Sequence, residues 1–333
     1  MGDRGKVTDP VLLDETLLTG KEIDQGAAYF QLQHMLDTRL SDADRFPLKA
    51  EKIRFMNINE DTAPLVINWQ QSEENRIHPP MDWPIVQKYY QAVTFSPEHG
   101  KFTACHMYVD PAGGGMNGDE TAYAVTKLLA GKIFLVALGG VKGGLDQVQM
   151  DQLTDIAVQW KPNTITIEEN YGKGALSSTW QPTLFQKHKC EIIDEWVSGQ
   201  KELRIIDTLE PIIGAGKLVC DISLLESDWA ATKHYPINNR ASYSFWYQLS
   251  RITRDKGALI HDDRLEAVAA SCRYWLDGLK VDEEIQKTAA ALAAYNAMMK
   301  DPLRTGRQPT GWANMNRRGP ATPSAFDKTR RRF

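Results

Sequence analysis

The chain has 333 residues, of which 42% are hydrophobic and 25% charged, and its formal net charge is −4. This length allows a sizeable core, and the near-neutral charge excludes a polycation whose whole surface attracts nucleic acid. No apolar run approaches the roughly 20 residues that span a bilayer, and the polar N-terminus lacks the apolar core of a secretion signal. The sequence therefore predicts no membrane partner.

The four cysteines and seven histidines are spaced in ways that predict no metal centre of their own. The cysteines are far apart and form no CxxC pair, so they are expected to be buried thiols in a reducing compartment. The histidines show no HExxH spacing. Any metal chemistry must therefore rest on carboxylates.

The first hundred residues carry weak structural signals. Residues 1–50 are polar, although 27–40 have apolar residues at helical spacing. Residues 51–95 are interrupted by prolines, as in IHPPMDWP, and are predicted to form an extended connecting region with little core of its own.

From residue 101 onward, apolar runs predict strands and apolar residues three or four apart predict helices. Strands are expected at 102–109, 121–129, 133–138, 164–167, 190–194 and 217–221, and helices at 145–162, 180–188, 202–213, 238–252, 262–276 and 281–299. The first three strands form an antiparallel meander. This order predicts an α/β protein of the RNase H-like fold, with a mixed central sheet flanked by helices.

Acidic residues stand at the ends of three of these elements. Asp110 ends the first strand, Glu168 ends the fourth, and Asp262 and Asp263 begin the helix after GALIH. If the two strands are neighbours, Asp110 and Glu168 share one edge of the sheet, and a helix packed across the sheet brings Asp263 there too. Such like charges need a counter-charge, which Mg²⁺ or Mn²⁺ supplies because hard cations take oxygen ligands.

Two such ions about 3.5–4 Å apart can clamp the attacking and leaving oxygens of a phosphodiester. The glycines at 113–115, just after Asp110, leave room for a nucleic-acid backbone to approach. Each acid also has a structural interpretation, since Asp110 can begin an Asx-turn and Asp262 or Asp263 can cap a helix. Glu168, which ends a buried-looking strand, is harder to explain in this way, and together the acids favour a metal site.

Residues 300–333 carry nine Lys or Arg and two Asp, interspersed with Gly and Pro. This composition predicts a flexible basic tail. It is equally compatible with a solubilising role and with a docking arm for an acidic surface or nucleic acid.

Three segments resemble the nuclease motifs of phage terminase large subunits: VDPAGGGMNGDETAYAV, ITIEENYGKGAL and KGALIHDDRLEAVA. The group they resemble is that of autographivirus-type short-tailed phages, also called DNA maturase B, and KELRIIDTLEPII and YPINNRASYSFWYQLSRIT resemble its intervening segments. The resemblance covers about residues 1–300. It implies a metal-dependent DNA endonuclease that cuts concatemeric genomes when head filling begins and ends.

Matched motif by motif, Asp110 is the family's first acid and Glu168 its second. The third acid lies in HDDRLEA, where Asp263 is preferred, Asp262 is close behind and Glu266 stays open one helical turn further on. The cofactor implied is a pair of Mg²⁺ or Mn²⁺ ions.

Other residues near the motifs have two interpretations each. Asp119 is an auxiliary ligand or a turn residue, and His261 is structural or donates a hydrogen bond to a ligand. Lys142, Lys173 and Arg264 flank the motifs and are candidates for contacts with DNA phosphates, or else solvated surface residues.

The resemblance also implies a division of the chain and a set of partners. Residues 1–50 would be the end of an ATPase motor domain, 51–95 a linker, 96–280 the nuclease domain, and 281–333 a helix and basic tail that docks to the prohead portal. Double-stranded DNA and the terminase small subunit are the other expected partners. The protein would act in the host cytoplasm and transiently at the portal.

No GxxxxGK[ST] phosphate loop is found in this sequence. GAGKLV at 214–219 is a partial match only, because Pro211 stands where the first glycine belongs and Leu218 replaces Ser or Thr. We therefore expect this chain alone not to hydrolyse ATP.

Three alternatives remain open beside the nuclease. Actin-like and sugar-kinase ATPases share the core fold but need a second phosphate loop and an adenosine-binding glycine pair. Resolvase and transposase cores would lack the N-terminal linker and the docking tail. A non-catalytic portal-docking module would use the acids structurally, so that Asp110→Ala would leave portal binding unchanged and no cleavage would be seen.

Overall fold

The computed structural model describes residues 45–279, except 80–81, 84, 86, 113–119, 143–145 and 171–173, and six isolated positions outside that range. The helices predicted at 27–40 and 281–299 and the basic tail therefore lie outside the described residues, isolated positions apart. In the described part, no helix is long and apolar enough to cross a membrane.

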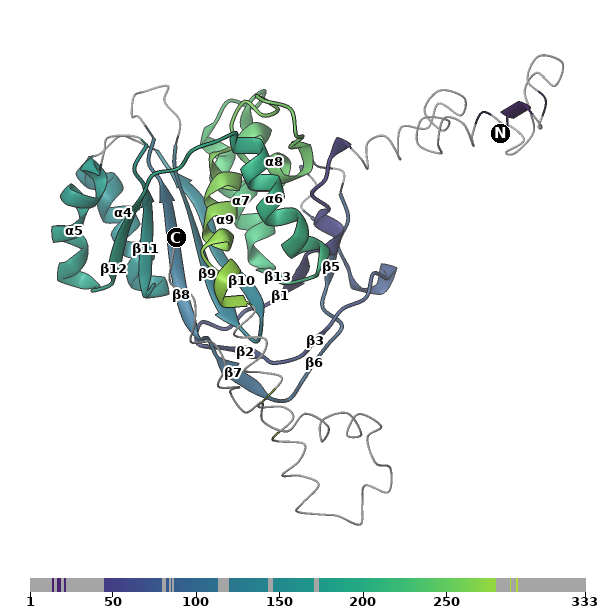
Figure 1. The fold of residues 1–333 in the computed structure, drawn as a ribbon, viewed down its shortest axis with the longest axis horizontal. Helices are drawn as coiled ribbons and strands as arrows, with labels where there is room; N and C mark the ends of the chain where they lie inside the picture. Colours follow the sequence, from purple (N-terminus) through teal and green to yellow (C-terminus); the bar gives the residue numbers. More distant parts are fainter. Residues whose placement is uncertain are drawn as a thin grey trace, which may run out of the picture. The chain divides into compact units, whose positions relative to one another are not determined.

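A nine-stranded mixed sheet forms the centre of the described region, in the order β12-β11-β8-β9-β10-β13-β1-β5-β4 (Figure 1). The strands β8, β9 and β10 pair antiparallel, while β11 joins β8, and β12 joins β11, in parallel. On the other side, β13, β1 and β5 continue the sheet in parallel. The nine strands are β1 (Arg54–Met56), β4 (Arg76–Ile77), β5 (Tyr89–Gln91), β8 (Ala104–Asp110), β9 (Thr121–Leu129), β10 (Lys132–Val141), β11 (Thr164–Glu168), β12 (Glu191–Glu195) and β13 (Leu218–Asp221).

The predicted antiparallel meander is confirmed, and so is the RNase H-like order of the strands around it. Ala130 and Gly131 form the turn between β9 and β10, with φ of 52° and 67°. Positive φ at both central residues is the type I′ geometry that suits the twist of a hairpin. The predicted neighbours are also correct, because β8 and β11 pair with Val109 opposite Ile167.

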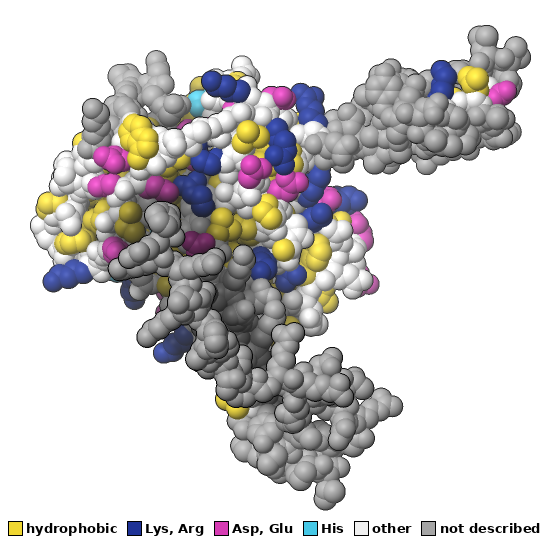
Figure 2. Space-filling model, in the orientation of Figure 1, with side chains coloured by type: hydrophobic (Ala, Val, Ile, Leu, Met, Phe, Trp, Pro, Cys, Tyr) yellow, Lys and Arg dark blue, Asp and Glu magenta, His cyan; other side chains and the backbone are white. Residues whose placement is uncertain are grey.

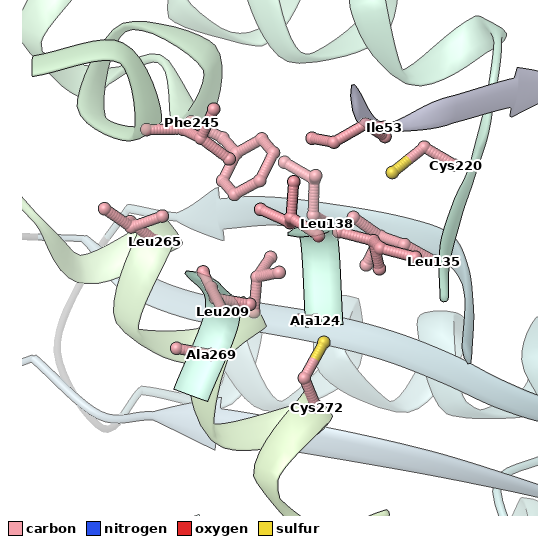
Figure 3. Packing of buried hydrophobic residues seen from close by; sticks show 14 of the residues in the cluster. Ile53, Ala124, Leu135, Leu138, Leu209, Cys220, Phe245, Leu265, Ala269 and Cys272 are labelled. Carbon is pink, nitrogen blue, oxygen red and sulfur yellow. The ribbon is translucent and has the colours of Figure 1, made fainter. Parts of the chain in front are cut away.

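Helices cover both faces of the sheet and enclose two hydrophobic cores. On one face, Leu153 of α4 and Trp180 of α5 pack against Ile165 and Ile167 of β11. On the other face, α6, α7, α8 and α9 contribute to the larger core, part of which is drawn in Figure 3. The helices are α4 (Gln147–Trp160), α5 (Ala175–Lys187), α6 (Lys201–Gly214), α7 (Ser223–Ala231), α8 (Phe245–Arg251) and α9 (Asp263–Arg273).

Most helix predictions hold in the described region, with two differences. The segment 238–252 is not one helix, because the 3-10 turn η4 (Arg240–Tyr243) precedes a shorter α8. The helix α7 was not predicted at all; only three of its apolar residues, Leu224, Leu225 and Trp229, are buried, so the helical signal in this short segment is weak.

The prediction that residues 51–95 have little core of their own is wrong. β1 and β5 lie inside the main sheet, and Phe55 and Tyr89 are fully buried. The ring of Phe55 lies 5.3 Å from that of Trp246 in α8, centroid to centroid. The same region adds two short antiparallel pairs, β2 (Thr62–Pro64) with β7 (His99–Lys101) and β3 (Ile67–Asn68) with β6 (Thr94–Phe95). Among the described prolines of this region, Pro79 lies between β4 and β5 and Pro64 ends the short strand β2, so neither interrupts the main sheet.

Candidate metal centre

Three carboxylates meet where β8 and β11 end. One oxygen from each of Asp110, Glu168 and Glu266 lies within 4.8 Å of the others. Asp110 is the last residue of β8, Glu168 the last of β11, and Glu266 lies in the first turn of α9. Parallel pairing places the two strand ends at one edge of the sheet, and α9 packs across β8 and β9 so that its first turn reaches that edge.

The acids line a cavity of about 330 Å³ that is open to solvent. Asp263, Asn170 and Lys201 also line it. Since a water molecule occupies about 30 Å³ in the liquid, the cavity has room for cations together with several waters.

The electrostatics of the cluster are unfavourable without a bound cation. Burial raises the pKa of Asp110 to about 8, and the neighbouring carboxylate of Glu168 adds to this shift. Carboxyl groups so close cannot all be ionised at neutral pH at low cost. The donor set is all oxygen, which fits Mg²⁺ or Mn²⁺.

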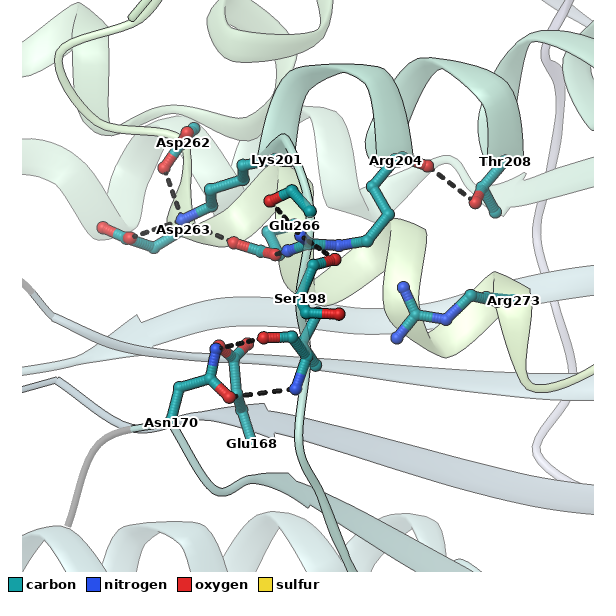
Figure 4. Close-up of polar contacts among 12 residues, drawn as sticks. Glu168, Asn170, Ser198, Lys201, Arg204, Thr208, Asp262, Asp263, Glu266 and Arg273 are labelled. Carbon is teal, nitrogen blue, oxygen red and sulfur yellow. Dashed lines mark hydrogen bonds and ion pairs between the residues drawn. The ribbon is translucent and has the colours of Figure 1, made fainter. Parts of the chain in front are cut away.

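A lysine from α6 supplies part of the missing positive charge (Figure 4). The Nζ atom of Lys201 lies 2.7 Å from Asp262, 3.6 Å from Asp263 and 2.5 Å from Glu266. Burial alone would lower the pKa of Lys201, but the carboxylates of Asp262, Asp110 and Asp263 outweigh burial and raise it. Arg204, one helical turn further along α6, forms a second ion pair with Glu266.

Neighbouring side chains hold the edge of the cavity in place. The hydroxyl of Tyr108 donates a hydrogen bond of 3.2 Å to Glu168, which orients that carboxylate. The side chain of Asn170 donates to the carbonyl of Val197 at 2.6 Å and accepts from the amide of the same residue at 2.9 Å. These two hydrogen bonds connect the segment after β11 to the segment after β12.

The structure groups Glu266, not Asp263, with Asp110 and Glu168. Asp263 lines the same cavity but is drawn toward Lys201. Asp262 stands at the N-cap of α9, makes no side-chain cap bond, and also pairs with Lys201. The geometry thus favours Glu266 as the third ligand, the alternative left open one turn beyond Asp263.

The remaining candidate residues lie outside the acid cluster or outside the described residues. His261 stacks on Tyr243 with ring centroids 3.9 Å apart, beside the acids but not among them. Lys142 is exposed, and its Nζ lies 4.8 Å from the ring centroid of Tyr235. Asp119 and Lys173 fall outside the described residues.

Arg264 is fully buried, so the prediction that it contacts DNA is wrong. Its guanidinium donates to Glu120 at 2.9 Å and to Asp228 at 2.8 Å. Burial alone would lower the pKa of Arg264, but Asp228 and Glu120 outweigh burial and raise it. Its charge is used inside the protein.

Further contacts extend this buried cluster of Arg264, Glu120 and Asp228. The hydroxyl of Tyr235 donates to Glu120 at 2.9 Å, and that of Ser244 donates to Asp228 at 2.6 Å. Gly140 of β10 faces Glu120 so closely that a Cβ there would lie 1.9 Å from the carboxyl carbon. Only a glycine leaves Glu120 room to reach the arginine.

Sequence reasoning missed four residues of the cavity: Glu120, Asn170, Lys201 and Arg204. Two signals were present. Lys201 and Arg204 are three positions apart at the start of a predicted helix, and so share a face. Asn170 follows the acid pair that ends the fourth strand. Neither signal says that these faces turn toward Asp110.

Two sequence comparisons match this chain. A family described as "Terminase Bacteriophage T7, Ribonuclease H-like domain" matches residues 109–218. The terminase large subunit of Enterobacteria phage T3 is 32% identical over 291 residues, which is 85% of this chain and 49% of that protein. The chain therefore spans about half the length of this relative.

Comparison with solved structures finds terminase nuclease domains at low similarity. The large terminase nuclease of thermophilic phage G20c is 14% identical, with a TM-score of 0.36, over 68% of this chain and 97% of that one. The terminase nuclease domain of human cytomegalovirus, solved after a manganese soak with an inhibitor bound, is 12% identical, with a TM-score of 0.36, over 52% of this chain and 83% of that one. Because these TM-scores are low, the similarity to terminases rests on the two sequence matches.

Proposed function

We propose that this chain is the nuclease part of a DNA-packaging terminase and hydrolyses DNA phosphodiesters with divalent metal ions, because residues 109–218 match the family described as "Terminase Bacteriophage T7, Ribonuclease H-like domain". The convergence of Asp110, Glu168 and Glu266 within 4.8 Å carries this proposal. The three acids come from three separate elements, and a bound cation would offset the repulsion between their carboxylates.

The roles of the acids follow from their positions. Asp110, Glu168 and Glu266 would hold two Mg²⁺ or Mn²⁺ ions. When bound, such ions activate a water and neutralise the departing oxygen. Tyr108 keeps Glu168 oriented through its hydroxyl. Asp262 and Asp263 hold the Lys201 ammonium at the mouth of the cavity, where it can contact a DNA phosphate.

The biological setting rests on the family. We propose that the chain cuts concatemeric DNA at the start and end of head filling, in the host cytoplasm and at the prohead portal. Its partners would be double-stranded DNA, the terminase small subunit, and the portal through residues 281–333. The motor that hydrolyses ATP would belong to the part of the T3 relative that this chain does not span.

Plasmid nicking by the purified chain tests the proposed activity. Wild type is incubated with Mg²⁺, Mn²⁺ or EDTA, beside Asp110→Asn and Glu266→Gln. We expect cutting with either metal, none in EDTA, and at least about a hundredfold loss in both variants, because each removes a charged ligand.

Glu195→Gln is the matched control. Glu195 ends β12 directly opposite Glu168 in the register, but its carboxylate pairs with Arg273 and is not part of the acid cluster. Its replacement should leave cutting within about threefold of wild type. A folded wild-type chain that never cuts with either metal, or an Asp110→Asn variant that cuts equally well, would favour the non-catalytic portal-docking module.

A further inference from the structure

A second cavity, of about 450 Å³, lies beside the acidic one and shares none of its lining residues. Its walls come from the segment that enters the fold before η1 (Ala50–Lys52), from the end of α8, and from the loop between α8 and α9. Arg45, Arg251 and Lys256 are among the lining residues. In Figure 2, Lys and Arg side chains lie over α6 and α8 on the visible face, interspersed with acidic ones.

The cations of this cavity are gathered without matching carboxylates. The guanidinium groups of Arg45 and Arg251 lie 5.4 Å and 5.6 Å from the centroid of the same ring, that of Phe46. Within the described part of the chain, neither these arginines nor Lys256 forms an ion pair. The one acid in the wall, Asp255, is exposed and accepts a hydrogen bond of 3.1 Å from Thr253.

A neighbouring arginine, Arg254, differs from the cations of the cavity because it forms ion pairs. Arg254, in the same loop, is paired with Asp207 at 3.0 Å and with Glu210 at 2.7 Å. Two carboxylates within reach of the loop therefore pair with Arg254, and among the described residues none forms an ion pair with Arg251 or Lys256. Like charges held together in this way attract an anion, and arginine suits phosphate because its planar donors match the oxygens.

The cationic cavity is joined to the acidic one through the start of α6. Gln200 donates to the carbonyl of Arg254 at 3.0 Å, and the amide of Gly257 donates to Glu202 at 2.6 Å. Between them, Lys201 points to the acids. His261 lines the cationic cavity and Asp263 the acidic one, two residues apart in the chain. Two residues span at most about 7 Å, so the walls of the two cavities meet along this segment.

We propose that the cationic cavity binds the phosphate backbone of DNA beside the acidic site. This inference rests on the proposed function for the identity of the polyanion. Phosphate contacts of this kind fix register and orientation and carry no sequence information, so they would serve cutting without sequence preference.

Binding of a short fluorescent DNA duplex in EDTA, across a salt series from about 50 to 200 mM, tests the proposal without any cutting. The variant is Arg251→Gln with Lys256→Gln, and the matched control is Arg254→Gln. Each lost phosphate contact should reduce the salt slope by about 0.9 and the affinity by roughly eightfold at 0.1 M salt. The control, whose charge is already compensated, should stay within twofold of wild type.

Two further measurements keep the outcome decisive. Lys256→Gln alone, which leaves the Arg251–Phe46 contact intact, should give about half of the change in salt slope with an unaltered melting temperature. A double variant that binds the duplex like wild type overturns the proposal. The proposal is also overturned if inorganic phosphate raises the melting temperature of wild type, the double variant abolishes this increase, and both proteins bind the duplex with the same affinity. The cavity would then bind a free anion and not DNA.

Failure of this inference can be told apart from failure of the proposed function. A wild-type chain that cuts plasmid, with a double variant that binds and cuts equally well, removes only the role of the cationic cavity. A chain that binds duplex through Arg251 and Lys256 but never cuts removes only the nuclease.

Discussion

Two charged clusters lie two residues apart on the first turn of α9, and they are built in opposite ways. Arg264 is fully buried between Glu120 and Asp228. Glu266 faces a solvent-open cavity with Asp110 and Glu168, and its partners Lys201 and Arg204 are partly exposed. One cluster is closed around a planar guanidinium that binds two carboxylates, whereas the other is open to solvent and pairs with the ammonium of Lys201 and the guanidinium of Arg204.

The difference shows how the fold can hold the repelling carboxylates of the open cluster together. The buried cluster joins the start of β9, α7 and α9, and so holds the first turn of α9 against the sheet edge. That rigid anchor keeps Glu266 close to Asp110 despite their repulsion. The buried ion pairs therefore serve positioning, and the open cluster serves chemistry.

The largest effect should come from removing the anchor. Arg264→Met leaves Glu120 and Asp228 buried without a cation, which costs about 3–5 kcal/mol in the free energy of unfolding. Chemical denaturation measures this loss. Arg254→Met is the control, since its partners are exposed and the expected loss is below about 1 kcal/mol. Equal losses in the two variants would mean that the buried cluster is no anchor.

A smaller loss should follow when the anchor is distorted but not removed. In Gly140→Ala the new Cβ collides with Glu120, and moving that carboxylate should cost about 1–3 kcal/mol. Gly214→Ala, at a position with open space around it, should change stability by less than about 1 kcal/mol. If Gly140→Ala is as stable as wild type, the contact between Gly140 and Glu120 is looser than the structure indicates.

Substitution of an acid in the open cluster should increase the free energy of unfolding, whereas the two substitutions above decrease it. Wild type must take up a proton on Asp110 to fold at pH 7, whereas the side chain of Asp110→Asn is neutral in both states, so we expect unfolding of the variant in EDTA at pH 7 to cost about 1–2 kcal/mol more than in wild type, while cutting is lost. The folded pKa of about 8 exceeds the ordinary value of 3.8, so wild type loses stability as pH rises from about 4 to 8. Denaturation across this range should show a flatter profile for the variant. A destabilised Asp110→Asn would contradict the assignment of strain to the acids.

The smallest effect should be on metal affinity. In Lys201→Met no ammonium competes for the acids, so the Mn²⁺ concentration that half-saturates the thermal shift should fall about tenfold, equivalent to roughly 1.4 kcal/mol. Lys187→Met, whose partner Asp155 lies on the exposed surface of α4, should leave the midpoint unchanged. A midpoint that rises in Lys201→Met would show that the lysine assists metal binding.

The sequence by itself predicted the meander and the strands that follow it along the chain, and it placed two of the three clustered acids at strand ends. Asp110 and Glu168 could be placed because strand ends are local features, and parallel neighbours bring such ends to one edge. The terminase resemblance drawn from the three motifs is likewise confirmed by the family match and the T3 relative. These conclusions depend on patterns within a few residues or on segments matched in order.

Only the tertiary structure decided which residues of the first turn of α9 face which cluster. Asp263 and Glu266 are three positions apart, so helical periodicity puts both on one side, and the packing of α9 on the sheet brings Glu266 to Asp110. Arg264 looks like a surface cation in the sequence because its partner Glu120 is 144 residues away. Charge neutralisation is a property of distance in space, and no local pattern records which carboxylate an arginine will reach.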